Sequence, residues 1–280
     1  MKVLVADKLP DDRLSALEEH GCTVIYEPGL KDEALTEAMR SHRPDILIVR
    51  STKVPAEVIE AHKGLNLVIR AGAGYNTIDV ETASARSVYV ANCPGKNSIA
   101  VAELAFGLLV SLDRRIPDNV ADLRKGVWNK QEYSKAAGLY GRTLGVLGFG
   151  RIGQETAARA KAFGMHVAAW SRSLTAERAR EMGVRYADSP VELARSCDAI
   201  SVHLAATEDT RGFVSKEFFD AMKPGAYFVN TSRAEVVDEN ALEEAVREKG
   251  IRAGLDVFST EPSGKATEVE ASLFALPQVY

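Results

Sequence analysis

Short apolar runs alternate with amphipathic stretches along the first third of the chain. Residues 3–6, 23–26, 46–49, 67–69 and 88–91 are rich in Val, Ile and Leu and lie between polar segments, which predicts strands. Between them, residues 11–20 and 32–41 repeat apolar side chains about every 3.6 positions, as helices do. Strands that alternate with helices are typical of an open α/β domain with a parallel sheet.

The alternation stops at residues 92–97, Asn-Cys-Pro-Gly-Lys-Asn, and resumes beyond a polar stretch around Trp128. A Pro-Gly turn is a natural hinge, so we place a domain boundary between residues 1–93 and 94–280. A long apolar helix follows at residues 99–112, and further strands are expected at residues 143–147, 167–170, 199–202, 227–230 and 253–257. The pattern therefore predicts two doubly wound α/β domains.

Composition narrows the function to small-molecule chemistry in the cytoplasm. The 35 basic and 39 acidic residues nearly balance, so no strong field favours nucleic acid or an anionic membrane. Cys22, Cys93 and Cys197 lie far apart without metal-ligand spacing, so we expect core thiols in a reducing compartment and no metal site. Because the first residues resemble a strand, we expect no signal peptide there. The apolar run at residues 99–112 is shorter than the ~20 residues of a membrane span, so we expect no transmembrane helix.

The clearest motif is Gly148-Phe149-Gly150-Arg151-Ile152-Gly153, which joins the strand at residues 143–147 to a helical stretch at 154–163. In a G-x-G-x-x-G turn the first glycine permits the tight turn and the second lets a pyrophosphate approach the backbone. The third lets the helix pack on the strand, while the helix N-terminus, here Arg151 and Ile152, faces the phosphates. Placed between a strand and a helix, the motif predicts a dinucleotide site.

The next strand ends in Trp170-Ser171-Arg172-Ser173, where an NAD-binding protein usually has a carboxylate for the ribose hydroxyl. A guanidinium between two hydroxyls suits a 2′-phosphate, so we expect Ser171, Arg172 and Ser173 to favour NADP over NAD. A solvated loop arginine is the alternative.

Further polar segments follow strands at 50–52 (Arg-Ser-Thr), 70–74 (Arg-Ala-Gly-Ala-Gly), 229–233 (Val-Asn-Thr-Ser-Arg) and 254–262 (Gly-Leu-Asp-Val-Phe-Ser-Thr-Glu-Pro). Together with the glycine motif and residues 101–103, these segments resemble the D-isomer-specific 2-hydroxyacid dehydrogenases, especially the phosphoglycerate dehydrogenase type. The resemblance covers nearly the whole chain in order. It implies a flavodoxin-like substrate domain at 1–93 and a Rossmann dinucleotide-binding domain at 94–280.

By this resemblance Arg233 holds the substrate carboxylate and polarises the carbonyl, where a fixed guanidinium stabilises the negative charge that hydride transfer builds on oxygen. Glu261 would orient an acid/base histidine. The implied cofactor contacts also include Thr231, Ser232 and Asp256, although Asp256 could instead cap a loop. On the substrate side the implied residues are Arg50, Ser51, Arg70 and the backbone amides of Ala73 and Gly74. Pairing of Arg50 and Arg70 with acidic neighbours is equally open.

Two departures from the family pattern stand out. Ala234 and Glu235 follow Arg233 where the family has glycines, so the local loop is expected to differ. The family histidine belongs to a Pro-His-x-Gly segment beyond the strand that ends here at Tyr280. We therefore expect that the sequence is cut there, and that the 280 residues bind dinucleotide with almost no turnover. His203 matches a family position near the cofactor, but local hydrogen bonding is its more ordinary role.

The resemblance implies hydride exchange between a nicotinamide cofactor, NAD or NADP, and a D-2-hydroxy acid. 3-Phosphoglycerate is the first candidate and glycerate/hydroxypyruvate the second. A dinucleotide-sensing corepressor on the same fold is the alternative, whereas formate dehydrogenase suits the two arginines Arg50 and Arg70 poorly. The apolar helix at residues 99–112 suggests a homodimer contact, with a plain core helix as the other reading.

Overall fold

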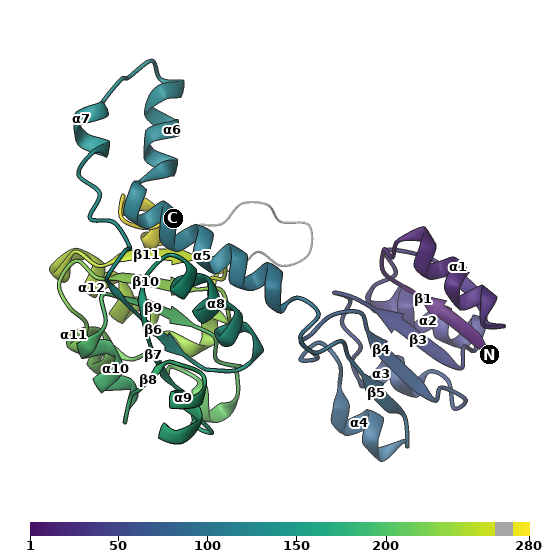
Figure 1. Ribbon diagram of the computed structural model, residues 1–280. Coiled ribbons are helices and arrows are strands. Elements are labelled where there is room, and N and C mark those ends of the chain that lie inside the picture. Colours follow the sequence, from purple (N-terminus) through teal and green to yellow (C-terminus); the bar gives the residue numbers. More distant parts are fainter. Residues whose placement is uncertain (261–270) are drawn as a thin grey trace. The chain divides into compact units, whose positions relative to one another are not determined.

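The computed structural model describes residues 1–260 and 271–280. The chain divides into two compact units, an N-terminal unit, Met1–Asn97, and a C-terminal unit, Ser98–Tyr280. Each unit is an α/β domain around one parallel sheet (Figure 1). Because Glu261 falls between the described segments, its predicted role lies outside the described residues.

The N-terminal unit has a five-stranded sheet in the order β2-β1-β3-β4-β5. Its strands are β1 (Lys2–Val5), β2 (Thr23–Tyr26), β3 (Ile46–Val49), β4 (Leu67–Arg70) and β5 (Tyr89–Ala91), and every described pairing is parallel. The helices are α1 (Asp11–Glu19), α2 (Asp32–His42), α3 (Ala56–Glu60) and α4 (Val80–Ala85). This is the flavodoxin-like order, and its direction reverses between β1 and β3.

Both faces of this sheet are buried, as the continuous apolar strands predict. One cluster packs Leu4, Leu47 and Val68 against Leu35 and Met39 of α2. On the opposite face Val3, Val5 and Ile48 pack against α1 and its surroundings. The carboxyl ends of β1, β3 and β4 are thereby held side by side at one edge.

The C-terminal unit has a six-stranded sheet in the order β11-β10-β9-β6-β7-β8, which is the Rossmann order. Its strands are β6 (Thr143–Leu147), β7 (His166–Trp170), β8 (Arg185–Tyr186), β9 (Ala199–Val202), β10 (Tyr227–Asn230) and β11 (Arg252–Leu255). The helices are α5 (Ser98–Arg114), α6 (Ile116–Arg124), α7 (Lys130–Tyr133), α8 (Arg151–Ala162), α9 (Ala176–Glu181), α10 (Pro190–Ser196), α11 (Lys216–Ala221) and α12 (Glu239–Lys249). Figure 1 shows α6 and α7 extending away from the sheet of this unit.

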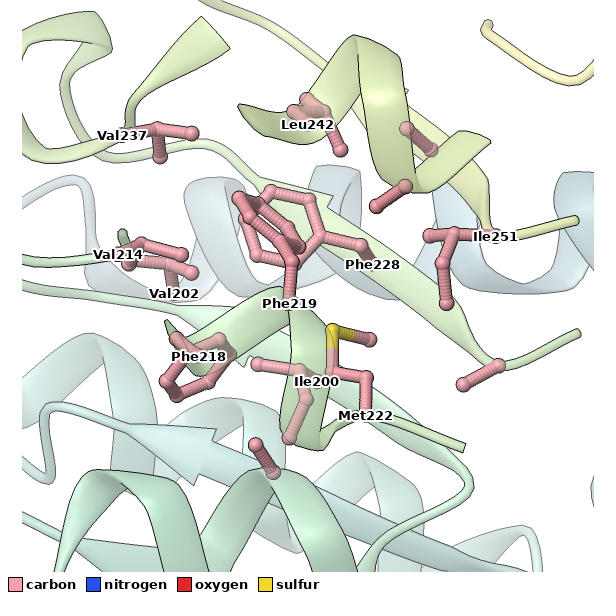
Figure 2. Close-up of a cluster of buried hydrophobic side chains, with 14 of the residues drawn as sticks. Ile200, Val202, Val214, Phe218, Phe219, Met222, Phe228, Val237, Leu242 and Ile251 are labelled. Carbon is pink, nitrogen blue, oxygen red and sulfur yellow. The ribbon is translucent and has the colours of Figure 1, made fainter. Parts of the chain in front are cut away.

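An aromatic core fixes β9 and β10 of the C-terminal sheet. Phe219 packs edge-on against Phe218, with ring centroids 6.1 Å apart, and against Phe228 of β10, 5.1 Å apart. Ile200 of β9 and Leu242 of α12 surround these rings (Figure 2). Because the cluster joins β9 and β10 to α11 and α12, it fixes the strands whose carboxyl ends carry His203 and Thr231.

The apolar helix predicted at residues 99–112 is α5, and it is mainly a core helix. Ala105, Phe106, Leu109 and Leu112 are buried, and the helix packs on α8, β10 and β11. Its exposed apolar residues, such as Ile99 and Leu104, are few. Among the described residues, no helix is both long and apolar enough to cross a membrane.

Candidate functional site

The glycine-rich turn connects β6 to α8 at the point where strand order reverses in the C-terminal sheet. Gly148 has φ +96°, and a Cβ there would lie 2.6 Å from the carbonyl oxygen of His203. A Cβ on Gly153 would lie 2.2 Å from the carbonyl oxygen of Gly148. The close approach of β6, β9 and α8 therefore demands glycine at both positions.

Gly150 differs from these two glycines. It precedes α8 with φ -73°, a conformation open to any residue, and a Cβ there would meet no atom of the described residues within 4 Å. The fold itself therefore does not require glycine at position 150. The open space lies beside the N-terminus of α8, where an incoming phosphate would meet Arg151, exposed, and Ile152, half-buried.

The side chains at the end of β7 lie largely in solvent. Arg172 is 90% exposed, and Ser173 is exposed while Ser171 is half-buried. The Arg172 guanidinium lies 3.8 Å from Asp209, which belongs to a 3-10 turn, Glu208–Thr210, in the loop after β9. No local pattern pointed to this carboxylate beside Arg172, because Asp209 is distant along the chain.

His203 follows β9 next to the glycine turn. Its Nε2 lies 2.9 Å from Ser201 Oγ, and its Nδ1 is buried without a hydrogen-bond partner among the described residues. Burial lowers the pKa of His203 to about 4, so the ring is uncharged near pH 7. The local hydrogen bond expected of this histidine is present. The backbone of His203 lies against the glycine-rich turn, because its N–H donates to the Leu147 carbonyl at 2.7 Å.

Asn230 shapes the loop that carries Arg233. Its Oδ1 accepts hydrogen bonds from the Ser232 backbone N–H at 3.0 Å and the Ser232 hydroxyl at 2.7 Å, while its Nδ2 donates to the Arg233 carbonyl at 2.9 Å. Thr231 is buried, and its hydroxyl has no partner among residues 1–260 and 271–280. A single asparagine thus fixes the backbone on both sides of Ser232.

Arg233 itself is half-buried, and its Nη1 donates to the Ser232 carbonyl at 2.6 Å. The residues that replace the family glycines form a short 3-10 turn, Ala234–Val236, in which Ala234 and Val236 are buried. Neither Ala234 nor Glu235 has positive φ, so side chains are tolerated there. Asp256 is exposed just after β11, and its N–H donates to the Asn230 carbonyl at 3.0 Å.

The structure thus brings the predicted cofactor residues to the carboxyl edge of one sheet. Gly148 and Gly150 follow β6, Thr231 and Ser232 follow β10, and Asp256 follows β11. The buried Thr231 hydroxyl, which has no partner among the described residues, and the open space beside Gly150 fit a bound dinucleotide. Asn230 was part of the sequence motif, but its positioning role became visible only in the structure.

In the N-terminal unit Arg50 and Ser51 directly follow β3, and both are exposed. Their backbone N–H groups do not face outward, because both donate to the carboxylate of Asp7 at the end of β1. No acidic side chain forms an ion pair with Arg50 or Arg70 within the ranges described. Sequence reasoning missed Asp7 altogether.

Arg70 ends β4, and its side chain folds over the following loop. A Cβ on Gly72 would lie 1.7 Å from Arg70 Nη1, so glycine at 72 leaves the space that the guanidinium occupies. Arg70 Nε is buried without a partner among the described residues. The loop is held by Asn92, whose Nδ2 donates to the Ala73 carbonyl at 2.6 Å, and Ala73 and Gly74 are half-buried.

Comparisons with known proteins agree with these features. Residues 106–280 match the family model described as D-isomer specific 2-hydroxyacid dehydrogenase, NAD binding domain. The chain is 43% identical over 264 residues to a D-3-phosphoglycerate dehydrogenase of Methanocaldococcus jannaschii, covering 94% of this chain and 50% of that protein. It is also 43% identical over 237 residues to a hydroxypyruvate reductase of Thermotoga maritima, covering 84% of this chain and 75% of the relative.

Among solved structures, the TT0316 protein of Thermus thermophilus superposes with a TM-score of 0.86 at 34% identity, covering 100% of this chain and 88% of that one. The chain therefore belongs to the D-isomer-specific 2-hydroxyacid dehydrogenase family and carries its nicotinamide-dinucleotide-binding domain. It spans about half the length of the phosphoglycerate dehydrogenase that it matches.

Proposed function

We propose that the protein is an oxidoreductase that exchanges a hydride between a nicotinamide dinucleotide and a D-2-hydroxy acid. One observation carries this proposal: two features lie at the same edge of the C-terminal sheet. They are the glycine-rich turn before α8 and the loop of Arg233, whose backbone is held by Asn230. When bound, the dinucleotide supplies the hydride donor or acceptor. The chain's own residues bind it, orient the acid and stabilise the charge on the substrate oxygen.

Arg233 is the proposed catalytic residue among those described. A guanidinium matches a carboxylate through two parallel hydrogen bonds, and it stabilises the negative charge that develops on a carbonyl oxygen. Asn230 supports this role because it holds the backbone next to Arg233 from two directions. A guanidinium held in place loses less entropy on binding than a free one. Glu261 remains the proposed partner of an acid/base group.

For the substrate we propose an anionic 2-hydroxy or 2-oxo acid, with 3-phosphoglycerate as first candidate and glycerate/hydroxypyruvate as second. Arg50 and Arg70 support an acid with a second anionic group, since neither forms a described ion pair. The amides of Ala73 and Gly74 would add hydrogen bonds. Ser51 was expected to contribute as well, but both of its donors, the N–H and the hydroxyl, are engaged by Asp7.

For the cofactor we propose a modest preference for NADP. Arg172 is exposed at the end of β7 between Ser171 and Ser173, where a 2′-phosphate would lie. Asp209, 3.8 Å from the guanidinium, opposes this preference because its charge partly compensates that of Arg172. We expect the preference to be small for that reason.

We further propose a cytoplasmic homodimer. The free cysteines Cys22, Cys93 and Cys197 suit a reducing compartment. Because α5 is mainly a core helix, the apolar side chains exposed on α6 and just beyond it are the better support for a second copy: Leu123 is 48% exposed and Trp128 is 77% exposed. Leu123→Glu with Trp128→Glu should yield a monomer in analytical ultracentrifugation.

The activity can be tested by absorbance at the nicotinamide band with a panel of 2-oxo acids. The full-length protein should oxidise the reduced dinucleotide with at least one of them, and Arg233→Ala should lower turnover about 10²-fold or more. Arg247→Ala, which removes an exposed guanidinium from the last turn of α12, is a matched control that should leave the rate unchanged. If Arg233→Ala keeps near-normal turnover with every accepted acid, its proposed role is wrong. If no acid is reduced while dinucleotide still binds, a dinucleotide-sensing role replaces the proposed reaction.

A further inference from the structure

Asp7 lies at the point where strand order reverses in the N-terminal sheet. It follows β1, and the Arg50-Ser51-Thr52 loop follows the neighbouring strand β3. In open α/β sheets, ligands bind outside the carboxyl ends of the strands at such a reversal. An acidic residue is unexpected at this position if the ligand is an anion, because the two charges would repel each other. The contacts of Asp7 show what its carboxylate does instead.

The carboxylate of Asp7 holds the whole loop, mainly through one of its oxygens. Oδ2 accepts the backbone N–H groups of Arg50 at 2.6 Å, Ser51 at 3.0 Å and Thr52 at 3.0 Å. Oδ1 accepts the Ser51 hydroxyl at 3.3 Å. These donors are consumed inside the protein, so the loop backbone cannot serve as an anion nest. What it offers to a ligand is the exposed side chain of Arg50.

The same hydrogen bonds stabilise the negative charge of Asp7. Burial raises the pKa of Asp7, but the backbone hydrogen bonds from Arg50, Thr52 and Ser51 outweigh it and lower the pKa from the ordinary value of 3.8. The carboxyl group of Asp7 is therefore ionised near pH 7, and the ionised form accepts stronger hydrogen bonds from the loop than the protonated form would.

We propose that Asp7 is a positioning residue that fixes the Arg50 loop for the anionic substrate. This inference rests on the proposed function. Asp7 acts through Arg50 and does not touch the substrate itself. A loop held in its binding conformation before the substrate arrives loses less freedom on binding, so Asp7 should lower the KM for the acid. It should leave dinucleotide affinity unchanged, because the glycine turn belongs to the other unit.

The test compares Asp7→Ala with Asp7→Asn and with a matched control, Asp45→Ala. Asp45 lies at the opposite edge of the same strand pair, where its Oδ2 accepts the Lys2 N–H at 2.7 Å. Asp7→Asn keeps an acceptor oxygen but loses the charge. Steady-state kinetics on the full-length protein would give KM and kcat for the acid, and calorimetry would give the dinucleotide Kd.

We expect Asp7→Ala to raise the KM for the acid about tenfold or more, with Asp7→Asn in between and both with unchanged dinucleotide Kd. Asp45→Ala should leave the KM unchanged even if it lowers the melting temperature similarly. In an Arg50→Ala background, Asp7→Ala should have little further effect on KM, since the two residues act as one unit.

An unchanged KM in Asp7→Asn and Asp7→Ala, in a protein that reduces the acid, would overturn the inference and leave the proposed function standing. The same holds if Asp45→Ala raises KM equally, or if the effects of Asp7→Ala and Arg50→Ala simply add. If the unmodified protein reduces no 2-oxo acid, the proposed function fails and the inference fails with it. Should Asp7→Ala not fold, Asp7→Asn alone decides between these outcomes.

Discussion

Gly150→Ala separates the needs of the fold from those of the ligand. A Cβ at position 150 meets no atom within 4 Å in the part of the chain that the structure describes, and φ is -73°. We therefore expect the free energy of unfolding to change by less than about 1 kcal/mol. The same methyl would occupy the open space through which a pyrophosphate approaches the N-terminus of α8. Loss of one hydrogen bond to a charged group costs about 1.5–3 kcal/mol, which corresponds to a dinucleotide Kd about 10- to 150-fold weaker.

Gly153→Ala should have the opposite profile. Its Cβ would lie 2.2 Å from the Gly148 carbonyl oxygen, a backbone atom that cannot move without disturbing the turn. Such overpacking typically costs about 1–3 kcal/mol or more, so the melting temperature should fall clearly. Thermal denaturation and calorimetric titration with the dinucleotide measure both quantities for each variant. If Gly150→Ala binds dinucleotide normally, or is as unstable as Gly153→Ala, then Gly150 does not serve the ligand and the reasoning is refuted.

Single contacts lead to three more expected outcomes. NADPH should bind somewhat more tightly than NADH, and calorimetry should find that Asp209→Asn widens this preference while Arg172→Ala abolishes it. An NADH preference that is unchanged in Arg172→Ala would contradict the role proposed for Arg172. Phe219→Ala should lower the free energy of unfolding by about 3–5 kcal/mol in denaturant titration, because it removes the central ring of the aromatic core; a loss below about 1 kcal/mol would refute that role. Burial raises the pKa of Asp198, but hydrogen bonds from Lys223 and the main chain outweigh it and lower the pKa from 3.8. The stabilising contribution is therefore present above about pH 4 and is lost as the pH falls further, so denaturant titrations should show a shallower acid loss in Asp198→Asn than in the unmodified protein.

The sequence predicted those parts of the fold that depend on local pattern. Strands such as Thr143–Leu147 and Tyr227–Asn230 were recognised because they are apolar on both faces. The strand Arg185–Tyr186 was missed because two half-polar residues give no periodic signal. The helix Ile116–Arg124 was missed because none of its residues is buried.

The candidate site was predictable where one short motif carries the chemistry, as at Gly148 to Gly153 and Asn230 to Arg233. It was not predictable where partners lie far apart along the chain. Asp7 and Arg50 are separated by 43 positions and meet only because β1 and β3 are neighbours in the sheet. Asp209 reaches Arg172 in the same way, from the loop after another strand. Such pairs depend on sheet order, which no single segment encodes.

Hydride exchange with a D-2-hydroxy acid is the central claim, and isotope transfer tests it most directly. The full-length protein would be incubated with a 2-oxo acid and a reduced dinucleotide carrying deuterium at the transferring position. Chiral chromatography with mass spectrometry would then locate the label. We predict one deuterium on C2 of the D-hydroxy acid, and at most a trace when Arg233→Ala replaces the unmodified protein over the same time. A labelled L-hydroxy acid, or a D-hydroxy acid without deuterium, would contradict the account.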